Sequence, residues 1–289
     1  MKITPFFVTL VLVIIISMQA HSQKFYLGIG GGYGMPTAPA MQGTYNATIV
    51  QFNNTNSVIT DYSLSNSSVS YGKGLQACIT AGKMVNENIY AELGISYLSG
   101  AKFTSKTLNI SQYNDSSTET FVQSATMLRL IPSVIFTVGK TKIKPYAKLG
   151  LVIGFGTKIT LNSTSVSPSI TSQQKNISLQ KEETTGGIPL GYTAALGATY
   201  QFNNRFSLFA EINVITQSWS PSKKTIKSYI VNGVDKTSGL SQFDRETNYV
   251  NGYSYSDPNY PNNPNRALKT HYPFSSIGLN VGLHFSLHS

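Results

Sequence analysis

Eight stretches of this chain alternate large apolar residues with small or polar ones, and this period of two constrains the fold more than any other feature of the sequence. Successive side chains of a strand point to opposite faces, so each stretch is a predicted strand with two unlike faces. Beyond residue 22 no stretch is continuously apolar over the roughly 20 residues that a spanning helix needs. The predicted strands lie near residues 24–35, 71–84, 88–103, 122–139, 142–157, 187–203, 205–217 and 273–287.

The connections between these strands alternate between short and long. VNEN, GKTK and FNNR are tight turns that predict antiparallel hairpins, whereas long segments separate the other strands. Short turns should therefore gather at one end and long loops at the other. An even strand number with this asymmetry is typical of an outer-membrane barrel, with short periplasmic turns and long external loops. The sequence thus predicts an all-β fold, an eight-stranded antiparallel transmembrane β-barrel with both termini in the periplasm.

The polar face of the strands decides which face is inside. A soluble barrel would carry a charged exterior, but only 12% of the residues are charged, against about 25% in ordinary soluble domains. The polar face is instead rich in glycine and small residues, which suits a narrow lumen. We therefore predict that the apolar face meets lipid and that four charged residues point inward: Glu92, Arg129, Lys148 and Glu211.

The two acids and two bases of the predicted lumen can compensate one another. Lys148 and Glu211 lie at similar distances from their nearest tight turns, so they are the preferred pair. Arg129 lies further from the turns and could meet Glu92 only with the help of strand stagger.

Aromatic residues of the apolar face cluster near the strand ends, which predicts two interfacial girdles. The alternative is that aromatic residues simply favour strands. The predicted girdle near the short turns contains Phe25, Tyr200, Phe202, Phe206 and Phe285, and the one near the loops contains Tyr33, Tyr71, Tyr97 and Tyr192.

Residues 1–22 have the pattern of a signal peptide. Lys2 precedes an apolar run from Phe6 to Ile16, and the small residues Ala20 and Ser22 stand at the −3 and −1 positions. The apolar run is short for a membrane anchor, and no cysteine follows for lipid attachment. We expect cleavage before Gln23 and a barrel domain over residues 23–289.

The sequence offers no clear catalytic, cofactor or metal site. Cys78 is the single cysteine, and the net charge of +10 is spread along the chain without the basic, aromatic-interleaved cluster of a nucleic-acid site. IGGGYG precedes no helix, so its glycines read as lumen positions and not as a phosphate cradle. His284 with Ser286, and His271 near the external rim, are weak candidates for lipid chemistry because no acid is placed to orient the imidazole. His288 follows the last strand.

Four segments carry a resemblance to a known family: KFYLGIGGGYG after the leader, KPYAKLGLVIGFG, LFAEINV and the final IGLNVGLHFSL. With them the chain resembles the small bacterial outer-membrane β-barrel proteins of the porin-like family common in Bacteroidota, similar in plan to the OmpX and OmpW types. The resemblance implies outer-membrane lipid and the barrel-assembly machinery as partners. Family members usually end on a terminal aromatic residue, whereas this chain continues beyond Phe285 to Ser289.

Two functions follow as hypotheses, neither of them enzymatic. The first is a small passive pore for small solutes, its polarity set by the four lumen charges. The second is a non-conducting structural or adhesion barrel that acts through its external loops, because an eight-stranded barrel is nearly filled by its own side chains. Residues 248–266 are rich in Tyr, Asn and Pro, which suits either a binding loop for an extracellular ligand or a solvated, sequence-tolerant one. The Asn- and Ser-rich residues 36–70 allow the same two interpretations.

Overall fold

A computed structural model describes residues 25–37, 45–51, 60–64, 70–111, 116–139, 141–168, 175–252 and 262–287. The predicted signal peptide and His288 lie outside the described residues, as do parts of the segments 36–70 and 248–266. Among the described residues, no helix is long and apolar enough to cross a bilayer.

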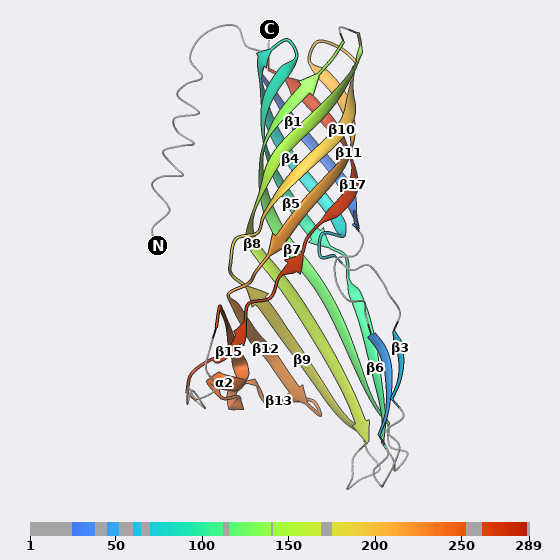
Figure 1. Cartoon of the computed structure of the whole chain (residues 1–289), viewed down its shortest axis with the longest axis vertical. Helices are drawn as coiled ribbons and strands as arrows, with labels where there is room; N and C mark the ends of the chain where they lie inside the picture. Colours follow the sequence, from blue (N-terminus) through green and yellow to red (C-terminus); the bar gives the residue numbers. More distant parts are fainter. Residues whose placement is uncertain are drawn as a thin grey trace.

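Eight strands close into a ring in which every neighbouring pair is antiparallel (Figure 1). They are β1 (Phe25–Pro36), β4 (Gly74–Asn86), β5 (Ile89–Gly100), β7 (Ser116–Thr137), β8 (Ile143–Pro168), β10 (Leu190–Gln201), β11 (Phe206–Trp219) and β17 (Ser276–Ser286). The first and last strands pair from Tyr26 with Ser286 to Pro36 with Ser276, which closes the ring. The predicted eight-stranded barrel is confirmed, strand by strand.

Short turns join the ring strands at one end of the barrel, between β4 and β5, β7 and β8, and β10 and β11. We call this the turn end; it is drawn at the top of Figure 1, and the opposite end is the loop end. The turn from β10 to β11 is held by Asn203, whose side-chain oxygen accepts hydrogen bonds from the backbone N–H groups of Arg205 and Phe206. The three tight turns predicted from the sequence are therefore confirmed.

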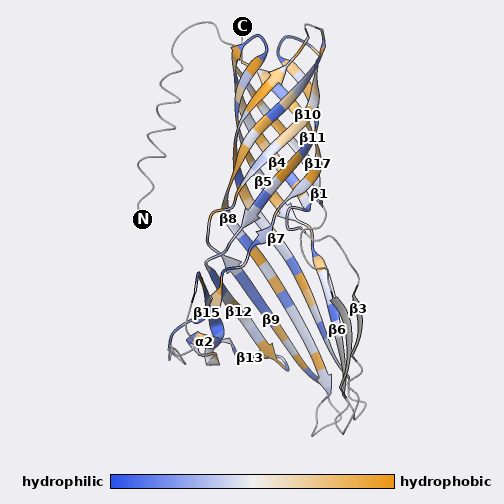
Figure 2. Ribbon diagram, in the orientation of Figure 1, coloured by the Kyte–Doolittle hydropathy of each residue, from blue (hydrophilic) through white to orange (hydrophobic). Residues whose placement is uncertain are grey.

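The wall of the barrel exposes its apolar face. Along β11, buried and exposed residues alternate without interruption from Phe209 to Trp219, and the exposed positions include Ile212 and Val214. Leu196 is 71% exposed and Leu151 is 50% exposed, values that would be unfavourable in water but suit a lipid-facing wall. Figure 2 shows the same alternation of hydrophobic and hydrophilic residues along the barrel strands.

Most residues of the two predicted girdles point outward, but Tyr71 does not. Its side chain is 3% exposed and packs against Phe274, Phe103 and Tyr272. That prediction was wrong because Tyr71 precedes β4, where the alternation of the strand does not yet apply. Phe25, at the opposite end, is half-buried and lines an internal cavity.

Beyond the loop end, the strands continue as an open sheet, which we call the extension. β7 and β8 are 22 and 26 residues long and run out of the barrel to form its centre (Figure 1). On the β7 side follow β6 (Phe103–Ser111), β2 (Tyr45–Gln51) and β3 (Thr60–Leu64), with β2 parallel to β6. On the β8 side follow β9 (Lys175–Thr185), β12 (Lys223–Val231), β14 (Glu246–Val250) and β15 (Asn265–Leu268).

Four small elements complete the loop end: β13 (Val234–Asp235), the 3₁₀ turn η1 (Thr237–Gly239), the helix α2 (Gln242–Arg245) and β16 (Tyr272–Pro273). Ser241 caps α2, because its hydroxyl accepts a hydrogen bond from the backbone N–H of Asp244. The sequence predicted most of this region as loops. The prediction was wrong because β6 and β9 pair with the long β7–β8 hairpin and the other strands add to them in turn, and short-range patterns do not reveal such distant pairings.

A break in strand register marks the boundary between barrel and extension. The β7–β8 pairing shifts between Thr126 and Leu128, opposite the segment of β8 that contains Gly156. Gly156 has φ of +57°, a left-handed conformation that glycine adopts without the steric cost borne by other residues. This bulge resets which side chains face outward where the strand leaves the barrel.

Candidate functional site in the barrel lumen

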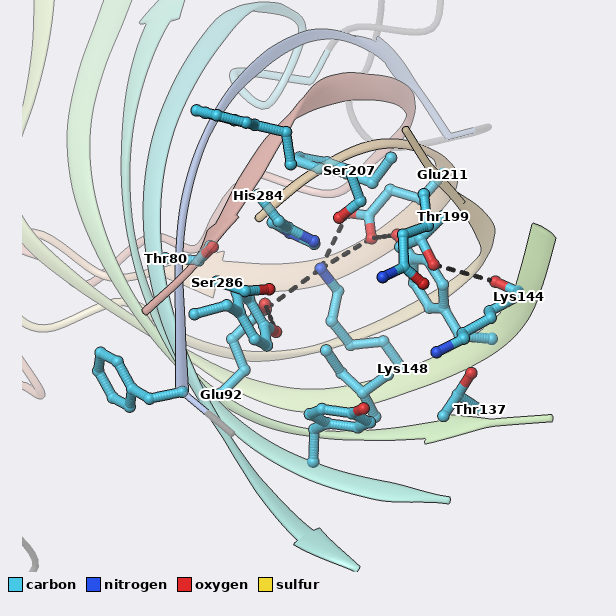
Figure 3. Close-up of a pocket in the computed structure, with 18 of the residues that line it drawn as sticks. Thr80, Glu92, Thr137, Lys144, Lys148, Thr199, Ser207, Glu211, His284 and Ser286 are labelled. Carbon is cyan, nitrogen blue, oxygen red and sulfur yellow. Dashed lines mark hydrogen bonds and ion pairs between the residues drawn. The ribbon is translucent and has the colours of Figure 1, made fainter. Parts of the chain in front are cut away.

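Lys148 lies between two carboxylates in the middle of the lumen. Its Nζ is 2.8 Å from Oε2 and 3.0 Å from Oε1 of Glu211, and 3.5 Å from Oε1 of Glu92. Figure 3 shows the ammonium group reaching between the two acids. The predicted pair of Lys148 with Glu211 is present, and Glu92 joins it to make a cluster of three charges.

Three neutral side chains complete this cluster. The Tyr26 hydroxyl donates to Oε2 of Glu92 at 2.5 Å, and the Tyr146 hydroxyl donates to Oε2 of Glu211 at 2.8 Å. Asn280 donates from Nδ2 to Oε1 of Glu211 at 3.1 Å. Buried charges are costly unless they are paired and their remaining lone pairs are satisfied, and these donors meet that requirement for Glu211.

Glycines of the neighbouring strands provide the space for these groups. A Cβ atom at Gly197 would lie 2.7 Å from Cζ of Tyr146 and 2.8 Å from Cβ of Glu211. Gly82 lies against the Tyr26 ring, and Gly32 against the Asn280 amide. The small residues of the inner face therefore do more than line a narrow lumen, because they let large polar side chains from adjacent strands meet.

Arg129 lies apart from this cluster. Its Nε donates to Oε1 of Gln217 at 3.0 Å, Nη1 to Oε1 of Gln76 at 3.5 Å, and Nη2 to the carbonyl oxygen of Phe274 at 3.4 Å. The suggested contact with Glu92 is absent. The register explains why: Arg129 pairs with Ser96 while Glu92 pairs with Ser133, an offset of four residues or roughly 13 Å along the strand.

Apolar side chains fill the lumen next to Arg129 on the loop-end side. We call this group the plug: Tyr71, Leu98, Ala125, Met127, Ile159, Trp219 and Phe274. Leu98, Trp219, Phe274 and the adjoining Arg129 have no exposed surface. The indole Nε1 of Trp219 donates to the carbonyl oxygen of Gly186 at 2.7 Å, which ties the plug to the turn between β9 and β10.

The turn end of the lumen is hollow by contrast. A cavity of about 390 Å³ extends from the charged cluster to the β10–β11 turn residues Asn203 and Asn204. Aromatic side chains from four strands contribute to its lining: Tyr26, Tyr90, Tyr146 and Phe209. A smaller space of about 40 Å³ lies on the other side of the cluster, toward Asn213 and Ile215. The lumen is therefore hollow at the turn end and closed by packed side chains at the loop end.

The weak catalytic candidates are placed as follows. His284 and Ser286 both line the cavity, and the His284 ring lies between Phe209, at 4.6 Å between centroids, and Tyr26, at 4.5 Å. Figure 3 shows both side chains on the cavity wall. His271 is exposed at the loop end. Within the described ranges, no group of three or more His, Cys, Asp or Glu side chains is arranged to hold a metal ion.

No family model matches the sequence. No curated protein matches it either. Among solved structures, the crystal structure of Neisserial surface protein A (NspA) is similar at 11% sequence identity and a TM-score of 0.33, over 92% of this chain and 99% of that one. The assignment of this chain to an eight-stranded barrel rests on its own strand pairings.

Several residues of the lumen were not predicted from the sequence. Tyr26 and Tyr146 have inward parity, each two residues from a recognised inner position, so extending the alternation to the strand ends would have found them. Trp219 also continues the inner face of β11. Phe274 lies just before β17 but inside the predicted strand 273–287, and it has the same inward parity as the buried Ser276, so the alternation would have found it as well.

Proposed function

We propose that this chain is a non-enzymatic integral barrel of the bacterial outer membrane that is closed along its axis and acts through its external extension. The plug carries the proposal. Solutes that travel along the lumen would have to pass Arg129, Trp219 and Phe274, which leave no surface exposed to solvent.

The membrane part of the proposal follows from the wall and the connections. The ring strands other than β7 and β8 have 11 to 14 residues, enough for the 9–11 that a tilted spanning strand needs. All eight ring strands expose an apolar face, and the closed ring leaves no free strand edge within the barrel. Short turns on one side and a large folded region on the other match the periplasmic and external sides of such barrels.

The extension has the character of an external surface. Its strands carry ion pairs between neighbours, such as Lys224 with Glu182 at 3.3 Å and Lys223 with Glu246 at 2.9 Å. The hydrogen bond from Lys223 also holds the pKa of Glu246 below its usual value. A sheet that projects beyond the barrel (Figure 1) can contact a partner outside the cell, whereas the plug closes the lumen on that side.

Single-channel recording of the refolded chain 23–289 in a planar bilayer tests the closed barrel. We expect no stable openings from the wild-type protein, and openings from a double variant, Arg129→Ala with Phe274→Ala, that removes the polar and apolar sides of the plug. Steady conductance of the folded wild type would refute a closed barrel and support a passive pore. The polar cavity at the turn end is the observation that favours this second function.

Protease treatment of intact cells tests the orientation separately. Lys236 is exposed in the extension, and Lys142 is exposed in the turn between β7 and β8. We expect trypsin to cut after Lys236 from outside and to leave Lys142 intact until the outer membrane is opened. The reverse pattern would place the extension in the periplasm.

A further inference from the structure

We propose that the turn-end cavity is a binding site for a small organic amine, with the ligand ammonium group against Glu92 and its apolar body among the aromatic side chains. The site faces the periplasm only if the orientation given under the proposed function holds. Binding itself does not depend on that orientation.

The charge of the cluster favours a cationic ligand. Glu92, Glu211 and Lys148 in their ionised forms carry a net charge of −1. Glu211 accepts short hydrogen bonds on both oxygens, at 2.8 to 3.1 Å. Among the described residues, Oε1 of Glu92 has only Lys148 at 3.5 Å, so this oxygen retains capacity for a stronger donor.

The walls suit the apolar part of such a ligand. Tyr26 lies between Tyr90, at 6.1 Å between ring centroids, and His284, at 4.5 Å. Phe209 stacks on the other side of His284. Aromatic faces attract cations in addition to packing against apolar groups. At about 390 Å³ the cavity falls within the roughly 300–1,000 Å³ typical of small-molecule sites, so it holds one small molecule.

Thr80 belongs to the lining of the cavity, but its hydroxyl does not contribute to the proposed site. Its Oγ1 is buried against Gly28 beside the His284 ring, so it exposes no surface to a ligand. Figure 3 shows Thr80 and His284 on the wall of the same cavity.

The cavity lining also restricts the number of ligand charges. Lys144 lies on β8 two residues nearer the turn than Tyr146 and supplies a second cation to the lining. It would repel a positive charge in the part of the cavity nearest the turns, where Gln201 and Ser207 offer neutral polar groups. A ligand with one ammonium group at one end and a neutral polar group at the other is therefore favoured over a diamine.

Isothermal titration of the folded chain 23–289 in detergent tests this inference. Tyramine has the required form, 3-(4-hydroxyphenyl)propionate replaces its ammonium with a carboxylate, and cadaverine is a diamine. We expect tyramine to bind at least tenfold more tightly than either analogue. Glu92→Gln should weaken tyramine binding at least tenfold, whereas Glu183→Gln, the same change in the extension, should leave it unaltered.

Thr199→Phe provides an independent variant, because it narrows the cavity without removing a charge of the cluster. It should abolish tyramine binding even if Glu92→Gln folds poorly. No heat of binding at millimolar tyramine, equal binding of the carboxylate analogue, or binding that survives Thr199→Phe would each overturn the site. Since the titration requires no membrane, a conducting barrel would refute the proposed function and leave this result intact.

Discussion

Strand β8 passes through two environments, and its outward face changes with them. Within the barrel that face contains Leu149, Leu151 and Phe155, while Lys148 points into the lumen. Beyond Gly156 the outward positions include Lys158, whose Nζ is 3.7 Å from Oε1 of Glu183 on β9. On this one continuous strand, the charged side chain points inward within the barrel and outward within the extension.

The ion pairs of the two regions differ in the same way. The side chains of Lys148 and Glu211 are 14% and 4% exposed, against 42% and 19% for Lys158 and Glu183. Water screens the second pair, so it contributes little to stability, whereas breaking the first leaves a charge in the lumen. With the proposed membrane location, lipid contact should end near the bulge at Gly156. Four substitutions test the contrast between the two regions, and the second of them tests this boundary directly.

The largest effect is expected at the junction of the two regions, from Trp219→Ala. The indole is fully buried and its removal leaves a cavity in the plug. We expect a loss of about 3–5 kcal/mol in the free energy of unfolding in detergent, the usual cost of truncating a buried tryptophan. Tyr192→Ala, on the outer wall, is the control and should cost far less in a micelle. Equal losses would mean that the plug is not a packed core.

A lysine on the outward face of β8 should distinguish lipid from water directly. Leu151→Lys places a charge on the barrel wall and should cost about 2–4 kcal/mol in a phospholipid bilayer near the midplane. Thr164→Lys makes a similar change on the extension and should alter stability by less than about 0.5 kcal/mol. Guanidinium unfolding in lipid vesicles measures both. A large cost at Thr164 would move the membrane boundary beyond Gly156.

Removing one lumen charge should cost less than removing the tryptophan. Glu211→Gln takes the short ion pair from Lys148, but Glu92 remains as a partner. We expect a loss of about 1–3 kcal/mol, the range for weakened buried hydrogen bonds. Glu183→Gln is the matched change in the extension, and its effect should stay below about 1 kcal/mol and shrink with added salt. An unchanged unfolding midpoint for Glu211→Gln would reject the importance of the pair.

The smallest effect concerns the glycines of the inner face. Gly197→Ala adds a methyl group 2.6 Å from the backbone carbonyl oxygen of Ala210 and close to Tyr146 and Glu211, so we expect a cost of about 1 kcal/mol or somewhat more from overpacking. At Gly94 the nearest atom to an added Cβ is 3.5 Å away, an ordinary contact, and Gly94→Ala should be nearly neutral. Equal behaviour of the two variants in a denaturant titration would show that the lumen near Tyr146 has room to relax.

The barrel could be predicted from sequence because its signal is local and repeated. Alternation, tight turns and the small residues of one face each report on a few neighbouring positions, and together they located all eight strands and the inward orientation of Glu92, Arg129, Lys148 and Glu211. The pair of Lys148 with Glu211 followed from depth alone, because both strands are counted from tight turns at the same end.

Tertiary structure alone decided how the lumen is divided into cavity and plug, and that a folded extension lies beyond the barrel. Depth does not specify which side chains meet around a ring, so Arg129 could not be assigned to Gln76 and Gln217, nor Glu92 to Tyr26. The inward position of Tyr71 departs from the strand alternation, and the extension depends on pairings between segments far apart in the chain. Local patterns determine which face a residue takes, whereas contacts across the lumen and between distant strands depend on the closure and stagger of the whole barrel.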